Sequence, residues 1–162
     1  MTYRVFISHS APDRESVEAI RQAAIKVGVE PYIYEHDPRP GTMVAEKVQA
    51  EIRASHAMIL LLTRHSATSP YVQQEVGFAI AAAKPVLPLI ETGISEDRLA
   101  MLKGIEWVEF DPGSPASAVD ALSTELERLR LRKEARDELA LALGMVALMV
   151  LLIYLTSLEG GG

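Results

Sequence analysis

Five short apolar segments alternate with five helical patterns along the first 131 residues, and this alternation limits the possible folds more than any other feature. The apolar segments read YRVFIS, VEPYIY, AMILLLT, PVLPLI and IEWVEF. Strands that are joined through helices pair in parallel with right-handed crossovers, and the helices then cover both faces of the sheet. We therefore expect an α/β fold with a five-stranded parallel sheet in the flavodoxin-like order 2-1-3-4-5, with a Rossmann-type order as the alternative.

Local signals mark where the predicted helices begin and end. Asp13 can act as the N-cap of a helix from Arg14 to Val27, which Gly28 then ends. Ser69 is a suitable N-cap for a later helix, and Pro70 fits its first position because the missing N–H has no partner there anyway. The other helices are expected over residues 43–54, 95–104 and 114–131.

The helix expected over residues 70–84 carries a carboxylate beside its apolar stripe. That stripe consists of residues at helical spacing: Val72, Val76, Ala79 and Ala83. Glu75 lies about 60° from the centre of the stripe, since each residue turns the helix by about 100°. We therefore expect Glu75 to border the buried face. A simpler interpretation is that it caps the helix start or forms an ion pair with a nearby loop.

The C-terminal part predicts a membrane span. Residues 139–158 contain no charged side chain, and at about 1.5 Å per residue these 20 residues extend over about 30 Å, the thickness of a bilayer core. A buried core helix is the alternative, but such a helix normally keeps a polar face. Residues 132–138 form a basic juxtamembrane segment, and only 159–162 follow the span. The excess of Lys and Arg before it predicts a single-pass protein of the cell membrane with residues 1–131 in the cytoplasm.

Composition excludes several classes of function. The net charge is −6 with a pI near 5.2, and no basic stripe with interleaved aromatics is present, which argues against a nucleic-acid partner. The chain has no cysteine, and its four histidines lack the spacing of metal ligands, so we expect no metal site. Neither G-x-G-x-x-G nor a P-loop follows the first strand, which argues against a permanently bound dinucleotide and against a P-loop NTPase. Ser66, His65 and Asp13 offer the residue types of a catalytic triad, but only geometry identifies a triad.

A single carboxylate suits one kind of bond cleavage. In such sheets, ligands bind outside the carboxyl ends of the strands near the switch between strands 1 and 3, and the helix of Glu75 begins there. Cleavage of the nicotinamide–ribose bond of NAD⁺ needs no general acid, because the cationic nicotinamide leaves as a neutral molecule. One anion can then stabilise the oxocarbenium-like ribose. Ordinary glycosidases, by contrast, need two carboxyl groups.

Four segments in matching order resemble the Toll/interleukin-1 receptor (TIR) domain family. VFISHSAPD is similar to the family's first box, DPRPGT to its BB loop, SATSPYVQQE to the start of its αC helix, and IEWVEF to its last strand box. The resemblance covers residues 1–131 and implies a flavodoxin-like fold. A short domain of this kind followed by one span most resembles prokaryotic immune sensors or effectors, including anti-phage types.

The resemblance also implies roles for particular residues. In enzymatic members, the glutamate at the position of Glu75 is catalytic for NAD⁺ cleavage, and the aromatic residue one turn earlier, here Tyr71 in place of Trp, shapes the pocket. Residues expected to border the nucleotide are His9, Ser10, Arg39, Gly41 and Met43, with Arg39 suited to a phosphate. NAD⁺ is the substrate, and no cofactor is implied.

The resemblance leaves the product and the class of function open. Enzymes of this family release nicotinamide with ADP-ribose or a cyclic ADP-ribose isomer, and they self-associate, here through the BB loop (35–42) and the helix 70–84. Other members act as non-enzymatic adaptors that bind further TIR domains, so this remains the second hypothesis. A nucleoside-modifying transferase of related topology is the third.

Overall fold

The computed structural model describes residues 2–34 and 43–159 of the chain. Its sheet contains five parallel strands: β1 (Tyr3–Ser8), β2 (Val29–Tyr32), β3 (Ala57–Leu62), β4 (Val86–Glu91) and β5 (Val108–Phe110). The strand order is β2-β1-β3-β4-β5, which confirms the flavodoxin-like order and excludes the Rossmann-type alternative. The two outer strands are shorter than predicted, because the pairing of β2 with β1 ends at Tyr32 and the pairing of β5 with β4 begins at Val108.

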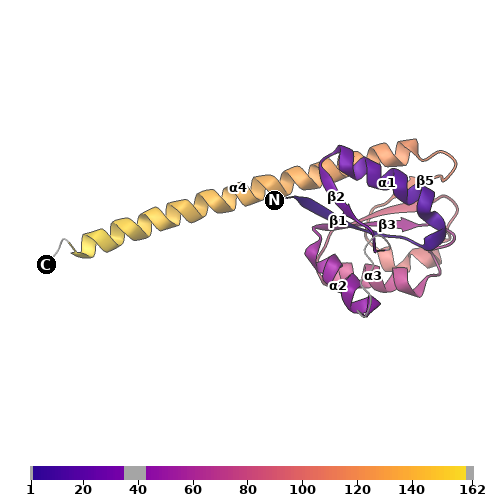
Figure 1. The fold of residues 1–162 in the computed structure, drawn as a ribbon, viewed down its shortest axis with the longest axis horizontal. Helices are drawn as coiled ribbons and strands as arrows, with labels where there is room; N and C mark the ends of the chain where they lie inside the picture. The colour runs from indigo at the N-terminus through magenta and orange to yellow at the C-terminus, as the bar shows by residue number, and fades with distance from the viewer. Residues whose placement is uncertain (1, 35–42, 160–162) are drawn as a thin grey trace. The chain divides into compact units, whose positions relative to one another are not determined.

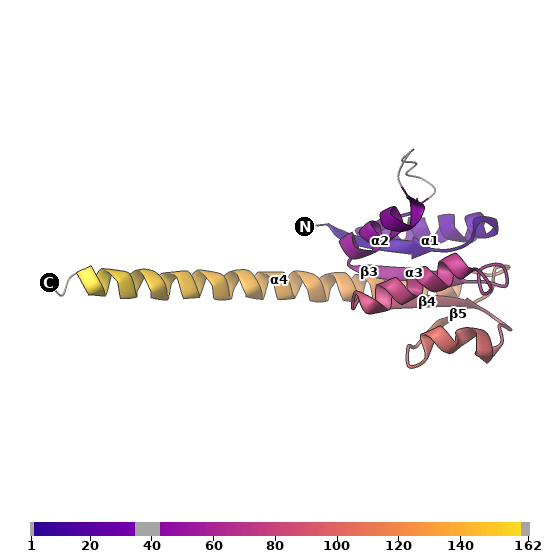
Figure 2. The same cartoon turned by 90° about the horizontal axis from the view of Figure 1, so that it is seen from below.

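Helices cover both faces of this sheet. Within the described residues these are α1 (Arg14–Lys26), α2 (Val44–Ala54), α3 (Pro70–Ala81) and α4 (Ala116–Glu159), with short 3₁₀ helices η1 (Ala11–Asp13) and η3 (Glu96–Leu102). Figure 1 shows α1 and the first turns of α4 on one face, and α2 and α3 on the other. Figure 2 shows α2 and α3 side by side in front of the sheet. The segment expected as an α-helix over residues 95–104 differs from the prediction, because it forms the 3₁₀ helix η3 instead.

The central strands supply the core on both faces. Every residue of β3 is buried, as the nearly continuous apolar run predicts for a strand covered on both sides. Because side chains alternate along a strand, Met58, Leu60 and Leu62 join the cluster under α2 and α3, together with Phe6 of β1. The intervening side chains, such as Ile59 and Leu61, are also fully buried and point to the opposite face.

The apolar stripe of α3 is confirmed for three of its four predicted members. Val72, Val76 and Ala79 are buried, whereas Ala83 is exposed. Ala83 lies beyond the end of the helix at Ala81 and has a φ of 52°. The prediction for Ala83 was wrong because helical spacing counts only as far as the helix continues, and a left-handed residue ends it.

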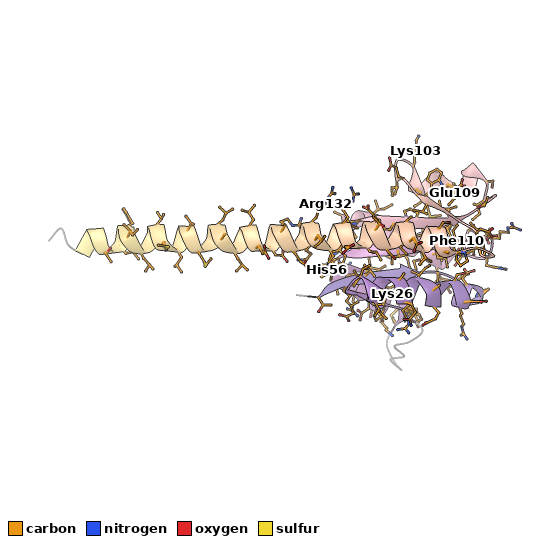
Figure 3. The ribbon with its side chains drawn as sticks, turned by 90° about the horizontal axis from the view of Figure 1, so that it is seen from above. Lys26, His56, Lys103, Glu109, Phe110 and Arg132 are labelled. Atoms are coloured by element: carbon orange, nitrogen blue, oxygen red, sulfur yellow. The ribbon has the colours of Figure 1, made fainter. Side chains whose placement is uncertain are left out.

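The helix α4 continues without a break through residues that sequence patterns divide into a domain helix, a juxtamembrane segment and a span. The chain divides into two compact units, Met1–Glu127 and Arg128–Gly162. Among the described residues, α4 is the one helix long and apolar enough to cross a membrane by length and composition, and none of its apolar window is buried. Figure 3 shows mostly carbon atoms on the side chains of its yellow end.

Two ion pairs join basic and acidic side chains of α4 just before the predicted span. Arg130 pairs with Glu134 at 2.8 Å and Lys133 with Asp137 at 2.5 Å, both at i,i+4 spacing. Such pairs on a helix surface contribute a few tenths of a kcal/mol each. The orientation predicted for the span is unaffected by these pairs, because the positive-inside tendency counts Lys and Arg residues rather than net charge.

Replacement of Leu60 by Ala should strongly destabilise the domain. Leu60 is 0% exposed in the centre of β3, so its truncation leaves a cavity and should lower the free energy of unfolding by about 2–5 kcal/mol. The control is Ile80→Ala on α3, because Ile80 is 46% exposed, and its cost should stay below about 1 kcal/mol. Denaturant titration of the full chain in detergent, followed through the fluorescence of its single Trp, measures both values. Equal costs for the two variants would contradict the assignment of Leu60 to the core.

Candidate functional site

Glu75 and Ser8 meet where β1 ends and α3 covers the sheet. The helix α3 begins as predicted, with Ser69 as N-cap accepting a hydrogen bond from the N–H of Val72 at 3.4 Å, and with Pro70 at its first position. Glu75 follows on the second turn and is half-buried. The Oγ of Ser8 donates a hydrogen bond to Oε2 of Glu75 at 2.5 Å. The carboxylate therefore borders the buried face, as its place beside the stripe indicates.

The contact of Ser8 with Glu75 was not predicted from sequence. Ser8 is the last residue of β1, and its side chain is 1% exposed. Strand alternation places it on the same face as Phe6, which lies in the core cluster together with Val72 and Val76 of α3. The signal was therefore present: a polar residue ends an apolar strand on the face that a following helix covers.

A second polar network holds the loops at the same edge of the sheet. Asp13 is buried, accepts a hydrogen bond from Ser10 Oγ at 2.7 Å, and has both carboxylate oxygens 3.0 Å from Thr63 Oγ1. Asp13 occupies the N-cap position of α1, as predicted, but its carboxylate makes no cap hydrogen bond to that helix. The reason is that Thr63, at the end of β3, and Ser10 offer it hydroxyl donors within the fold.

The possible triad of Ser66, His65 and Asp13 does not form. Ser66 Oγ donates to the carbonyl of Leu61 at 3.0 Å and accepts from the N–H of Thr63 at 2.7 Å. The side chain of Ser66 is 0% exposed, whereas His65 is exposed. In the described part of the chain, no hydrogen bond joins the side chains of His65 and Ser66. Ser66 therefore closes the turn after β3, and among the described residues His65 does not act as the base that a nucleophilic serine would need.

The other predicted site residues occupy the same edge but differ in exposure. His9 is half-buried, with Nδ1 3.4 Å from the carbonyl oxygen of Ile7, and Ser10 is bound to Asp13 as described above. Met43 and Tyr71 lie at the starts of α2 and α3 and are 66% and 73% exposed. Arg39 and Gly41, with the rest of loop 35–42, lie outside the described residues. The substrate-binding roles of these residues stay predictions.

A cavity of about 770 Å³ opens at the same edge on the side of α1. Asp13, Thr63, Arg64 and Glu91 are among the residues that line it, whereas Ser8 and Glu75 are not. Glu91 accepts a hydrogen bond there from the backbone N–H of Arg64 at 2.8 Å and forms an ion pair with the Arg64 guanidinium, whose Nε lies 2.7 Å from Oε1. The cavity therefore lies apart from the Glu75 carboxylate. Within residues 2–34 and 43–159, no group of three or more His, Asp or Glu side chains could hold a metal ion.

Comparison with known proteins identifies a family and a shared fold. The model of the family described as "TIR domain" matches residues 5–126. No curated protein matches the sequence. Several solved structures share the fold at low sequence identity, and three of them are given next.

The receptor TIR domain of TRR-2 from Hydra magnipapillata is 15% identical, with a TM-score of 0.57 over 84% of this chain and 98% of that one. A TIR-STING receptor from C. gigas, in complex with 2′,3′-cGAMP, is 20% identical, with a TM-score of 0.64 over 76% of this chain and 39% of that one. The CMP N-glycosidase BcmB from Clostridium botulinum is 16% identical, with a TM-score of 0.54 over 74% of this chain and 97% of that one.

Replacement of Asp13 by Ala should destabilise the domain by about 2–4 kcal/mol, because it leaves the buried hydroxyl of Thr63 and its bonded loop without their acceptor. The control is Asp120→Ala on α4, where the side chain is exposed and the cost should stay within about 0.5 kcal/mol. Thermal unfolding of the full chain gives the comparison. An unchanged midpoint for Asp13→Ala would show that the buried network contributes nothing to stability.

Proposed function

Since the chain belongs to the TIR-domain family, we propose that it is an NAD⁺ glycohydrolase or cyclase in which Glu75 is the catalytic residue. The observation that carries this proposal is the half-buried Glu75 carboxylate, held by Ser8 at the carboxyl edge of the sheet. This edge is where ligands bind in sheets of this topology. The products would be nicotinamide with ADP-ribose or with a cyclic ADP-ribose isomer.

The proposed reaction breaks one bond and needs no proton donor. The bond between the ribose C1′ and the ring nitrogen of nicotinamide breaks, and its electron pair neutralises the positive nicotinamide ring. Positive charge develops on the ribose, and the Glu75 carboxylate stabilises it in a partly buried setting where water screens less. Attack of water on C1′ gives ADP-ribose and releases a proton, whereas attack by a nucleophile within the same molecule gives a cyclic isomer.

Residues around Glu75 would hold the two ends of the dinucleotide. We assign His9, Ser10, Arg39, Gly41 and Met43 to the nucleotide side of the site and Tyr71 to the aromatic wall. Tyr71 and Met43 leave most of their surface open to solvent, so a substrate would bury apolar area by contacting them. A guanidinium such as that of Arg39 can bind a phosphate through paired hydrogen bonds.

We also propose that α4 anchors the protein in a membrane. The exposed apolar side chains of residues 139–155 support this proposal, because a water-facing helix rarely exposes so many. The TIR domain would lie on the cytoplasmic side, where Lys and Arg are enriched before a span. Anchoring raises the local concentration of neighbouring copies, which would favour self-association through loop 35–42 and α3. We propose that this membrane-bound protein acts in immune signalling, the role that its resemblance to prokaryotic immune sensors and effectors implies.

Replacement of Glu75 by Gln should lower nicotinamide release by at least about a hundredfold, because the amide keeps the shape of the side chain but not its charge. The assay is turnover of NAD⁺ by the full chain in detergent, with the products identified by mass. Glu109→Gln is the matched control, since this exposed glutamate lies on the far edge strand and its loss should leave turnover unchanged.

The same assay separates the alternative functions. Full turnover in Glu75→Gln would exclude the catalytic assignment, and wild-type protein without turnover would favour the adaptor hypothesis. An adaptor should lose partner binding on disruption of Pro40 or Gly41 but not in Glu75→Gln. The third hypothesis predicts that nucleosides are consumed in preference to NAD⁺, so nucleosides are offered beside NAD⁺. CMP is offered as well, because BcmB is named for N-glycosidase action on CMP.

Deletion of residues 139–162 should release the domain into the soluble fraction, because the proposed span is lost. The control deletes only 159–162 and should stay with the membranes. Fractionation followed by detergent extraction distinguishes membrane insertion from aggregation. A domain that lacks 139–162 and still needs detergent for extraction from membranes would rule out the span.

A further inference from the structure

We propose that Ser8 is a positioning residue that fixes the direction of the Glu75 carboxylate toward the reacting ribose. This inference rests on the proposed function, in which Glu75 stabilises positive charge on that ribose.

The hydroxyl of Ser8 is held rigidly by the sheet. Ser8 lies on β1, one of the inner strands, and its Cα is in register with Leu60 of β3. Two residues earlier, Phe6 pairs with Met58 on one side and with Tyr32 of β2 on the other. The side chain of Ser8 is 1% exposed, so its position depends on the protein rather than on water. The donor is therefore already in place before a substrate arrives.

The side chain of Glu75 does not by itself fix the direction of its carboxylate. The last torsion of a Glu side chain has a broad energy profile, so rotation of the carboxylate is weakly specified by the chain itself. Glu75 is only half-buried, and packing alone does not fix it. A hydrogen bond of 2.5 Å to Oε2 is typical of a donor that binds an ionised oxygen, and it selects one orientation of the carboxylate plane.

Orientation matters because the proposed catalysis is electrostatic. The stabilisation of a developing cation varies with the inverse of its distance from the carboxylate. A misplacement of about 1 Å can lower the rate about a hundredfold. Loss of the anchor should therefore reduce the rate of the chemical step more than it weakens binding of NAD⁺, whose other contacts remain.

The test compares four forms of the full chain in detergent: wild type, Ser8→Ala, Ser8→Thr and Ser55→Ala. Ser55 is the matched control, because its side chain is also 1% exposed and donates to the backbone carbonyl of Glu51 at 2.9 Å. Ser55 and His56 precede the start of β3, so Ser55 lies at the amino ends of the strands, away from Glu75. Figure 3 shows His56 at this end of the sheet and Phe110, the last residue of β5, at the other. Both alanine variants remove one buried hydroxyl, so they separate loss of stability from loss of positioning.

Ser8→Ala should lower kcat for nicotinamide release by about ten- to a hundredfold while KM changes less than about twofold. Ser55→Ala should keep kcat within about twofold of wild type, even where its melting temperature falls. Ser8→Thr keeps the hydroxyl donor and should recover at least part of the rate. Thermal unfolding of each variant confirms that the measured protein is folded.

Three results would overturn the inference. These are a kcat for folded Ser8→Ala within twofold of wild type, equal losses in Ser8→Ala and Ser55→Ala, or a folded Ser8→Thr as slow as Ser8→Ala. Adding Glu75→Gln to the series separates a failure of the role proposed for Ser8 from a failure of the proposed function. Turnover that disappears in Glu75→Gln but persists in Ser8→Ala removes only the role of Ser8. Turnover that persists in Glu75→Gln, or is absent from wild type, removes the proposed function and this inference with it.

Discussion

The parallel pairing of β1 with β3 is the contact on which the proposed site depends. Its register sets Ser8 beside Leu60, and strand alternation then turns the Ser8 side chain to the face that α3 covers. A shift of one residue would turn Ser8 to the opposite face and remove the donor from Glu75. The order of the strands also switches at β1, since β2 lies on one side of β1 and β3 lies on the other. Such a switch leaves room for a ligand between the diverging loops.

Two polar arrangements share this edge of the sheet and perform different tasks. The bonds between Ser10, Asp13, Thr63 and Ser66 join the loop after β1 to the loop after β3. Because the second loop leads directly into α3, these bonds also help to fix where that helix begins. The Ser8–Glu75 bond then directs a carboxylate on the next part of the same helix. Stability and the proposed chemistry thus use separate acidic residues, one buried and saturated with hydroxyl donors, the other partly open.

Much of the fold could be predicted because its signals are local. The apolar run of β3 and the Ser-Pro start of α3 are examples, since each depends only on neighbouring residues. Predictions were wrong where a distant residue or a change of backbone decided the outcome. The carboxylate of the N-cap residue Asp13 binds Thr63, which lies 50 positions later, instead of capping α1, and the left-handed Ala83 follows the end of α3. The edge strands β2 and β5 are shorter than their sequence runs, because their pairing with β1 and β4 covers only part of each run.

The sequence by itself determined the alternation of strands and helices, the family, the place of Glu75 beside an apolar stripe and the long uncharged C-terminal helix. Periodicity and composition act along the chain, so they are legible without coordinates. Only the tertiary structure decided which hydroxyl holds Glu75 and which residues Asp13 binds. Ser8 and Glu75 are 67 positions apart, and no local pattern links them. Their contact arises because parallel strands and the crossover helix bring two distant segments to one edge of the sheet.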